Sequence, residues 1–235
     1  MRAVIMQPSY MPWLGYFDRI EKSDVFIVFD NAQFTHKTSI LFQNRNKIRI
    51  AKVDGKDGWQ WITVPVKSNN GEPIREVKID NSQKWAEKHW KAIMFNYVNA
   101  KHFDNYSNFL ERMYNVQWEL LYDLNMETMK FLLDELGIKT DLVISSQIEK
   151  VKAKASDHLI GLCKEVGADE YLSGPYGKEY LEMDKFEKAG IKVEIHEFAH
   201  PEYEQAFPGF EANLSALDIL LNHGKEGSRK IMGWK

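Results

Sequence analysis

The segment Met6–Phe17, which reads MQPSYMPWLGYF, concentrates side chains that could hold a ligand. Two prolines restrict its backbone, and Gly15 permits a close approach where a helix begins. Free amides at a helix start form a natural binding site for an anion such as phosphate. A rigid connection whose aromatic residues pack in the core is an equally favoured interpretation. The side chains that we predict to line a ligand here are Gln7, Tyr10, Trp13 and Tyr16.

A second group of polar and basic residues follows the next apolar run of the chain. His36 could move a proton, and Lys37 and Arg45 could neutralise the charge of a phosphate or carboxylate in a transition state. Asn31 and Asn44 could hydrogen-bond the same ligand. Each residue taken singly is more typical of a solvated loop. As a group they follow a buried strand, and this position favours a functional interpretation.

The turn Ser173-Gly174-Pro175-Tyr176-Gly177 joins another apolar run to a helical pattern. Its backbone amides, with Ser173, Gly174 and Tyr176, could hold an anion, although a tight structural turn is equally compatible with the pattern. His200 is a second candidate for the residue that moves a proton. The sequence predicts no protein-bound metal, because neither HxxH nor HExxH is present.

These segments can form one site only if the elements before them share a sheet. Apolar runs alternate with helical patterns, which predicts an α/β fold with a doubly wound, mainly parallel five-stranded sheet of nucleotidyltransferase-like type. Ligands of such sheets bind beyond the carboxyl ends of the strands, where the candidate residues lie. The runs that we interpret as strands are residues 2–6, 24–30, 141–144, 170–173 and 191–195.

The apolar spacing becomes helical between residues 82 and 137, which predicts a helical insertion. The predicted division is therefore 1–81 as the first part of the α/β core with a small β extension, 82–137 as the insertion, and 138–235 as the second part of the core.

Three details of the helices are also predicted. Ser156 is expected to cap a helix, and the last helix is expected to end before Gly224. The lone acid Asp218 is interpreted as a core carboxylate in preference to a site residue.

Composition narrows the class of protein. The chain has 235 residues and a net charge of −3, which gives no field for attracting nucleic acid or acidic membranes. Its single cysteine, Cys163, excludes an internal disulfide, and no run approaches the ~20 apolar residues of a membrane span. We expect a cytoplasmic protein that binds a small nucleotide or nucleotide sugar and neither nucleic acid nor membrane. The sequence leaves homo-oligomerisation open.

Several blocks of the sequence resemble the WbqC-like protein family. They occur in order over almost the whole chain and read QPSYMPWLGYFDRI, SDVFIVFDNAQF, QNRNKI, WQWITVPV, YLSGPYGKEYL, HPEYEQ and FEANLSALDILLNHG. Members of that family occur in bacterial gene clusters for O-antigen and other surface polysaccharides. The resemblance implies a role in making or decorating an activated sugar.

The N-terminal segment is also similar, more distantly, to nucleotidyltransferases of the HxGH type. Trp13-Leu14-Gly15-Tyr16 would occupy the HxGH positions, so both histidines are absent. In those enzymes the histidines stabilise the phosphates of ATP. If such a cation is needed here, Lys37, Arg45 or Lys178 must supply it.

The leading hypothesis is a group-transfer enzyme that acts on a nucleotide or nucleotide-activated sugar in surface polysaccharide (O-antigen) biosynthesis. One alternative is a non-catalytic nucleotide- or sugar-binding or scaffold protein on the same fold, which the missing histidines favour. Another is an acyl or aminoacyl transferase acting on an amino sugar. The cofactor is left open, with a nucleoside triphosphate and Mg²⁺ as the candidate.

Overall fold

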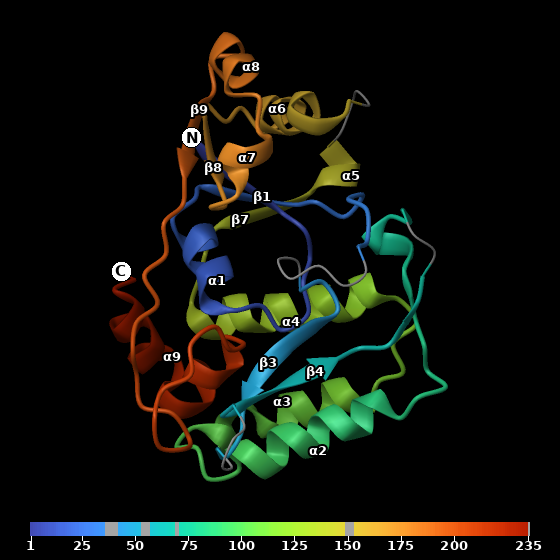
Figure 1. The fold of residues 1–235 in the computed structure, drawn as a ribbon, viewed down its shortest axis with the longest axis vertical. Helices are drawn as coiled ribbons and strands as arrows, with labels where there is room; N and C mark the ends of the chain where they lie inside the picture. Colours follow the sequence, from blue (N-terminus) through green and yellow to red (C-terminus); the bar gives the residue numbers. More distant parts are fainter. Residues whose placement is uncertain (36–41, 53–56, 69–70, 149–152, 235) are drawn as a thin grey trace.

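The fold is built around a five-stranded sheet in which all strands are parallel (Figure 1). The computed structural model describes residues 1–35, 42–52, 57–68, 71–148 and 153–234. The order of the strands across the sheet is β7-β2-β1-β8-β9. This confirms the predicted doubly wound α/β fold. The strands are β1 (Arg2–Met6), β2 (Val25–Val28), β7 (Asp141–Ile144), β8 (Glu170–Ser173) and β9 (Lys192–Ile195).

The central strand β1 sets the position of the ligand edge. The next two strands of this sheet along the chain, β2 and β7, lie on one side of β1, whereas β8 and β9 lie on the other side. The strand order therefore reverses between β1 and β8, and their carboxyl ends diverge there to leave a crevice. The segment after Met6 and the turn after Ser173 face each other across this switch point.

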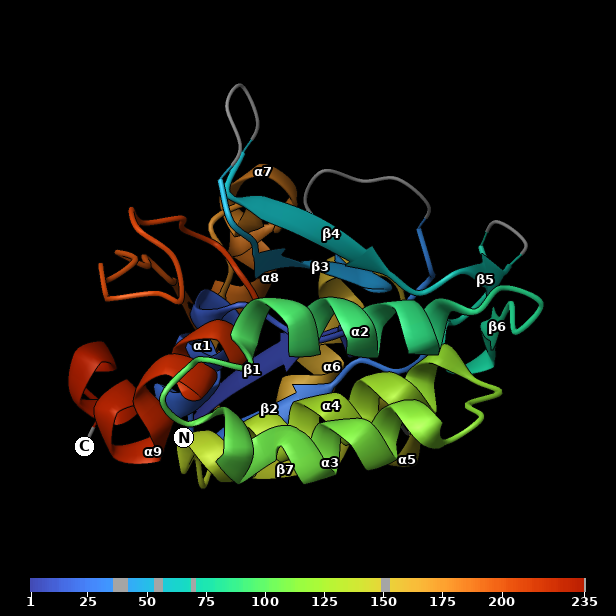
Figure 2. The same ribbon diagram turned by 90° about the horizontal axis from the view of Figure 1, so that it is seen from below.

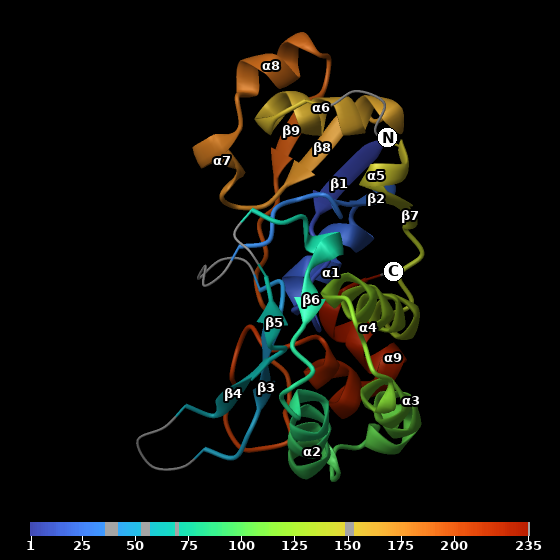
Figure 3. The same cartoon turned by 90° about the vertical axis from the view of Figure 1, so that its right-hand side faces the viewer.

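Helices cover both faces of the sheet (Figures 1 and 3). Val4 and Met6 point to one face, while Ala3 and Ile5 point to the other, as the two-residue period of a strand requires. No helix within the described ranges is long and apolar enough to cross a membrane. The first face packs against α1 (Leu14–Glu21), α4 (Leu121–Leu136) and α9 (Leu217–Met232), and the second against α6 (Ala155–Glu165) and α8 (Met183–Lys188), with α5 (Ser145–Ile148) next to α6.

Apart from α7 (Gly177–Tyr180), the remaining elements lie beside the α1 face of the sheet. The predicted helical region, residues 82–137, contains three helices: α2 (Trp85–Tyr97), α3 (Phe103–Asn115) and α4. Figure 2 shows α2 beside the antiparallel pair β3 (Arg45–Arg49) and β4 (Trp59–Thr63). Smaller elements are β5 (Val66–Lys67), the 3₁₀ turn Ile74–Glu76, β6 (Lys78–Ile79) and α7. The division into domains stays a prediction.

Strand β3 was not predicted, because its sequence RNKIR is mostly polar. Asn46 and Ile48 are buried, while Arg45 and Lys47 lie half-buried on the opposite face. A buried asparagine in place of an apolar residue hides the two-residue period. The side chain of Asn46 donates to the backbone oxygen of Met11, which gives this polar residue a partner inside the protein.

Of the two predicted helix boundaries, one differs in the structure and one is present. Ser156 does not cap α6, which begins at Ala155; its hydroxyl instead accepts a hydrogen bond from the backbone N–H of Glu182 at 3.0 Å. The helix that begins at Leu217 breaks at Gly224, as predicted, and a second helical stretch that was not predicted continues across this kink to Met232. Gly224 has a φ of 65°, and a Cβ there would lie 2.8 Å from the ring of His102. Glycine permits both this backbone conformation and the close contact.

A buried polar network joins β3 to the C-terminal region. Asp218 is 1% exposed and accepts hydrogen bonds from the Tyr97 hydroxyl at 2.7 Å and the Gln205 amide at 3.0 Å. Burial raises the pKa of Asp218 to about 6, against the effect of these donors. The Tyr97 hydroxyl in turn accepts from the backbone N–H of Arg49 at 2.8 Å. Asp218 is therefore a core carboxylate.

Candidate functional site

A cavity of about 660 Å³ opens at the switch point between β1 and β8. This volume is within the range of small-molecule binding sites. Its walls come from the segment after β1, from α1, from the start of α6 and from the turn after β8. Most of the lining is apolar and aromatic, which suits a ligand with a flat ring. The aromatic residues on its walls are Trp13, Tyr16, Phe29, Phe42, Tyr171, Tyr176 and Tyr180.

Arg19, on α1, is a cation in this cavity, which Glu179 also lines, and it forms no ion pair within the described part of the chain. Its Nε is buried without a hydrogen-bond partner, and no acceptor in the described part of the chain bonds to the rest of its guanidinium. Burial lowers the pKa of Arg19. Burying a charge without a partner is unfavourable, so such groups are rare unless they bind something. The arrangement suits an anionic ligand.

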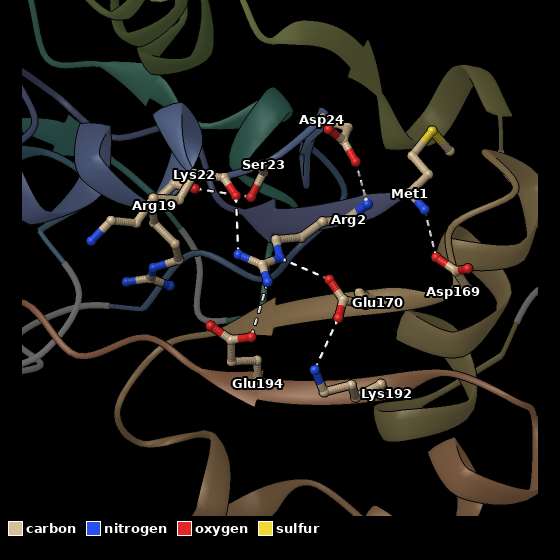
Figure 4. A network of polar contacts seen from close by, with 10 residues as sticks. All are labelled: Met1, Arg2, Arg19, Lys22, Ser23, Asp24, Asp169, Glu170, Lys192 and Glu194. Carbon is tan, nitrogen blue, oxygen red and sulfur yellow. Dashed lines mark hydrogen bonds and ion pairs between the residues drawn. The ribbon is translucent and has the colours of Figure 1, made fainter. Parts of the chain in front are cut away.

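The opposite edge of the sheet treats its charges differently (Figure 4). At the amino ends of the strands, Arg2 donates to Glu170 at 3.0 Å and to Glu194 at 3.0 Å, and Lys192 binds Glu170 at 3.1 Å. Figure 4 also draws Arg19, whose backbone oxygen accepts from Ser23 at 2.9 Å, and no dashed line joins its guanidinium to another residue in that view. The fold thus pairs the charges at one edge of the sheet and leaves Arg19 unpaired at the other.

Gly174 allows Arg19 to reach the cavity. A Cβ at Gly174 would lie 2.9 Å from one terminal nitrogen of the Arg19 guanidinium. Any side chain at this position would push the guanidinium away from the end of β8. The sequence suggested that Gly174 helps to bind an anion through its backbone. In the structure its lack of a side chain leaves room for the Arg19 guanidinium.

Gly15 has a different role from the predicted one. A Cβ at Gly15 would lie 2.3 Å from the Trp13 ring, so the indole occupies the space that a larger residue would fill. The glycine therefore seats an aromatic wall of the cavity, and the backbone N–H of the next residue, Tyr16, donates to the Trp13 oxygen at 3.0 Å. Tyr16 and Gln7 also line the cavity, and the Tyr16 hydroxyl donates to the Gln7 backbone oxygen at 3.0 Å.

Tyr10 lies outside the cavity, contrary to the sequence prediction. Its side chain is completely buried, and its hydroxyl lies 3.0 Å from His89 Nδ1 and 2.5 Å from the Tyr114 hydroxyl. These partners come from α2 and α3, so the polar end of Tyr10 serves the helical region. The predicted Tyr176 does line the cavity, at the turn after β8.

The other predicted polar residues in the described ranges also lie apart from the cavity lining and have local partners. Asn44 donates to the Val64 oxygen at 2.9 Å, and Asn31 accepts from Ser145 at 3.1 Å. Arg45 lies over the Trp61 ring, with 4.4 Å from its central carbon to the ring centre. The remaining member, His200, donates through Nδ1 to the Pro201 oxygen at 2.8 Å. His36 and Lys37 lie outside the described residues.

Ser173, at the end of β8, is completely buried beside Gly177. A Cβ at Gly177 would lie 2.2 Å from the Ser173 hydroxyl oxygen and 3.0 Å from its Cβ. The turn after β8 can therefore close onto α7 only because residue 177 has no side chain. This contact fixes the wall that carries Tyr176.

Replacing Gly177 with Ala is expected to lower the free energy of unfolding by about 1–3 kcal/mol, because the added methyl overpacks a buried contact. Gly161→Ala is the matched control: it lies inside α6 with no atom within 4 Å of the added carbon. The control should raise stability by about 0.5–1 kcal/mol through helix propensity. Urea unfolding of both variants measures the difference, and equal effects would contradict the proposed packing.

Sequence reasoning missed Arg19, the most informative residue of the site. It lies inside an ordinary amphipathic helix, so nothing in its local sequence marks it as a ligand residue. One signal was present: Gly15 and Arg19 are four residues apart, and Tyr16 and Arg19 are three apart, so all three share a helix face. The described residues contain no group of three or more His, Cys, Asp or Glu placed to hold a metal ion.

Comparison with known proteins places the chain in a family. The model of the WbqC-like protein family matches residues 7–230. The chain belongs to this family. The uncharacterized protein Rv1507c of Mycobacterium tuberculosis (strain ATCC 25618 / H37Rv) is 37% identical over 229 residues, which cover 96% of this chain and 95% of that protein. No solved structure matches the chain significantly.

Proposed function

We propose that this WbqC-like protein binds a nucleotide or nucleotide-activated sugar in the switch-point cavity and transfers a group to or from it. The observation that carries the proposal is the guanidinium of Arg19, whose buried Nε has no hydrogen-bond partner, in an aromatic-walled cavity. A planar guanidinium can bind two phosphate oxygens at once, and aromatic rings can stack on a base. The proposed role in surface polysaccharide synthesis rests on the family alone.

Arg19 supplies the cation that the sequence assigned to other residues. As the bond between the transferred group and the phosphate breaks, negative charge grows on the phosphate oxygens. A fixed cation inside a cavity stabilises this charge more strongly than it would in water. Lys37 keeps its predicted role as a further cation, and His36 its predicted role in proton transfer. Both roles rest on the sequence, because these two residues lie outside the described residues.

A ligand screen tests the proposal. The unfolding of the protein would be followed with nucleoside triphosphates and with UDP-, GDP-, CDP- and dTDP-sugars, each compared with its nucleoside and its free sugar. A ligand at 100 times its dissociation constant is expected to stabilise the protein by ~2.7 kcal/mol. Only compounds with phosphate should do so, because the phosphate is the group that pairs with Arg19.

The screen also separates the alternatives. Stabilisation by nucleosides as strong as that by nucleotides, or by none of the compounds at millimolar concentration, would contradict the proposal. Coenzyme A thioesters in the same screen test the acyl-transferase alternative. Nucleotide binding without turnover of any donor would favour the non-catalytic binding protein.

A further inference from the structure

A second cavity of about 380 Å³ adjoins the first. The two share Trp13 and Arg19 as lining residues, so the Arg19 side chain stands on their common wall. The other walls of the second cavity come from the turn after β8 and the segment after β9, and include Lys178, His196 and Phe198. A group bound beside Arg19 in the first cavity is therefore next to whatever occupies the second.

His196 is held in this second cavity by a buried carboxylate. Its Nε2 lies 2.7 Å from Asp18 Oδ2, and the side chains are 4% and 5% exposed. Asp18 also accepts from Lys22 Nζ at 2.7 Å and from Trp234 Nε1 at 3.0 Å. Burial acts to raise the pKa of Asp18, but the hydrogen bonds from His196, Lys22 and Trp234 prevail and lower it to about 2.

The charge of Asp18 fixes the tautomer of His196. An ionised carboxylate only accepts hydrogen bonds, so His196 Nε2 must carry the hydrogen that it donates. In the neutral ring the lone pair then lies on Nδ1. Among the described residues, the hydrogen bond of the His196 ring is made through Nε2. A histidine oriented through one nitrogen by a buried aspartate, with the other nitrogen available, is the arrangement of a general base.

We propose that the second cavity is the acceptor subsite, with His196 as general base and Asp18 as the residue that positions it. The inference rests on the proposed function and adds the acceptor class: a hydroxyl- or amine-bearing molecule such as a sugar. Its O–H or N–H gives a proton to His196 Nδ1 while the oxygen or nitrogen bonds to the transferred group. The bond from that group to the donor phosphate breaks, and its electron pair leaves with the phosphate beside Arg19.

His196→Gln tests the base without removing the structural contact. The amide nitrogen of glutamine takes the place of Nε2 and can still donate to Asp18, but no basic nitrogen is left. The rate of transfer, followed by ³¹P NMR as release of the nucleoside phosphate with sugar acceptors, should fall by about 10²–10⁴-fold. Donor affinity measured by calorimetry should stay within about twofold of wild type, because the phosphate still pairs with Arg19.

Asp18→Asn should release the tautomer, because a neutral amide no longer holds the hydrogen of His196 on Nε2. The amide has one acceptor in place of two, so it cannot keep the contacts with both Lys22 and Trp234 that position this group. A fall in the rate of transfer as large as that of His196→Gln is expected. Wild-type transfer rates in both variants would show that the pair is only structural and would overturn the proposal.

A second measurement does not depend on turnover. The ¹⁵N NMR shifts of the wild-type histidine side chains should show His196 protonated at Nε2 and unprotonated at Nδ1 at pH 7.5. The reversed tautomer would overturn the inference even if a donor binds. By contrast, the expected tautomer in a protein that binds no nucleotide would refute the proposed function while the geometry of the pair stands.

Discussion

Replacing Arg19 with Met is expected to weaken the binding of a phosphate-containing ligand by about 100-fold or more and to stabilise the free protein. Hydrogen bonds to a charged group contribute about 1.5–3 kcal/mol each, so losing a two-point contact with phosphate corresponds to at least two orders of magnitude in affinity. In the free protein the Nε of the same guanidinium is buried without a hydrogen-bond partner. An apolar side chain of similar length removes that cost, for a gain of roughly 1–2 kcal/mol.

Calorimetric titration with the ligand found in the screen measures the first effect, and thermal unfolding without ligand measures the second. Arg112→Met is the matched control, because Arg112 lies on an exposed face of α3. It should change neither quantity. Arg19→Lys should fall between Met and wild type in affinity, since an ammonium cannot bind two oxygens as a planar fork does. Unchanged affinity in Arg19→Met would remove the central support for the proposed site.

Replacing Arg49 with Met is expected to lower the free energy of unfolding by about 3–5 kcal/mol. Arg49 is 1% exposed, and its guanidinium donates to the backbone oxygens of Ile50 at 2.9 Å and Gly58 at 2.6 Å. It also donates to three oxygens of residues 207–209, the shortest at 2.7 Å. Removing it leaves these buried acceptors unpaired. It also removes a nearby positive charge that lowers the pKa of Asp218.

Arg45→Met is the control for this prediction. Arg45 lies on the same strand but is half-buried over the Trp61 ring, where a cation–π contact is worth about 0.5–1 kcal/mol. Chemical denaturation of the two variants at pH 7.5 should therefore separate them by at least about 2 kcal/mol. Equal losses of unfolding free energy in the two variants would show that the backbone hydrogen bonds of Arg49 contribute no more than the contact of Arg45 with the Trp61 ring.

The sequence alone determined the α/β sheet and the edge at which the cavity opens. The strands Asp141–Ile144 and Glu170–Ser173 have the bounds that the apolar runs predicted. This succeeds because a strand covered on both faces needs a continuous apolar run, which is a property of neighbours in the chain. The mostly polar strand β3 escaped the same reasoning, since a buried asparagine takes the place of an apolar residue.

Only the tertiary structure decided which polar side chains are already satisfied and which are not. Tyr10 looked suited to a ligand until His89 and Tyr114 were found beside its hydroxyl. Arg19 looked like an ordinary helix residue until its guanidinium was found unpaired in a cavity. Asp18 and His196 are 178 residues apart in the chain and 2.7 Å apart in space. Local periodicity specifies the elements, whereas the partners of a buried polar group are set by packing between distant segments, which a single sequence does not display.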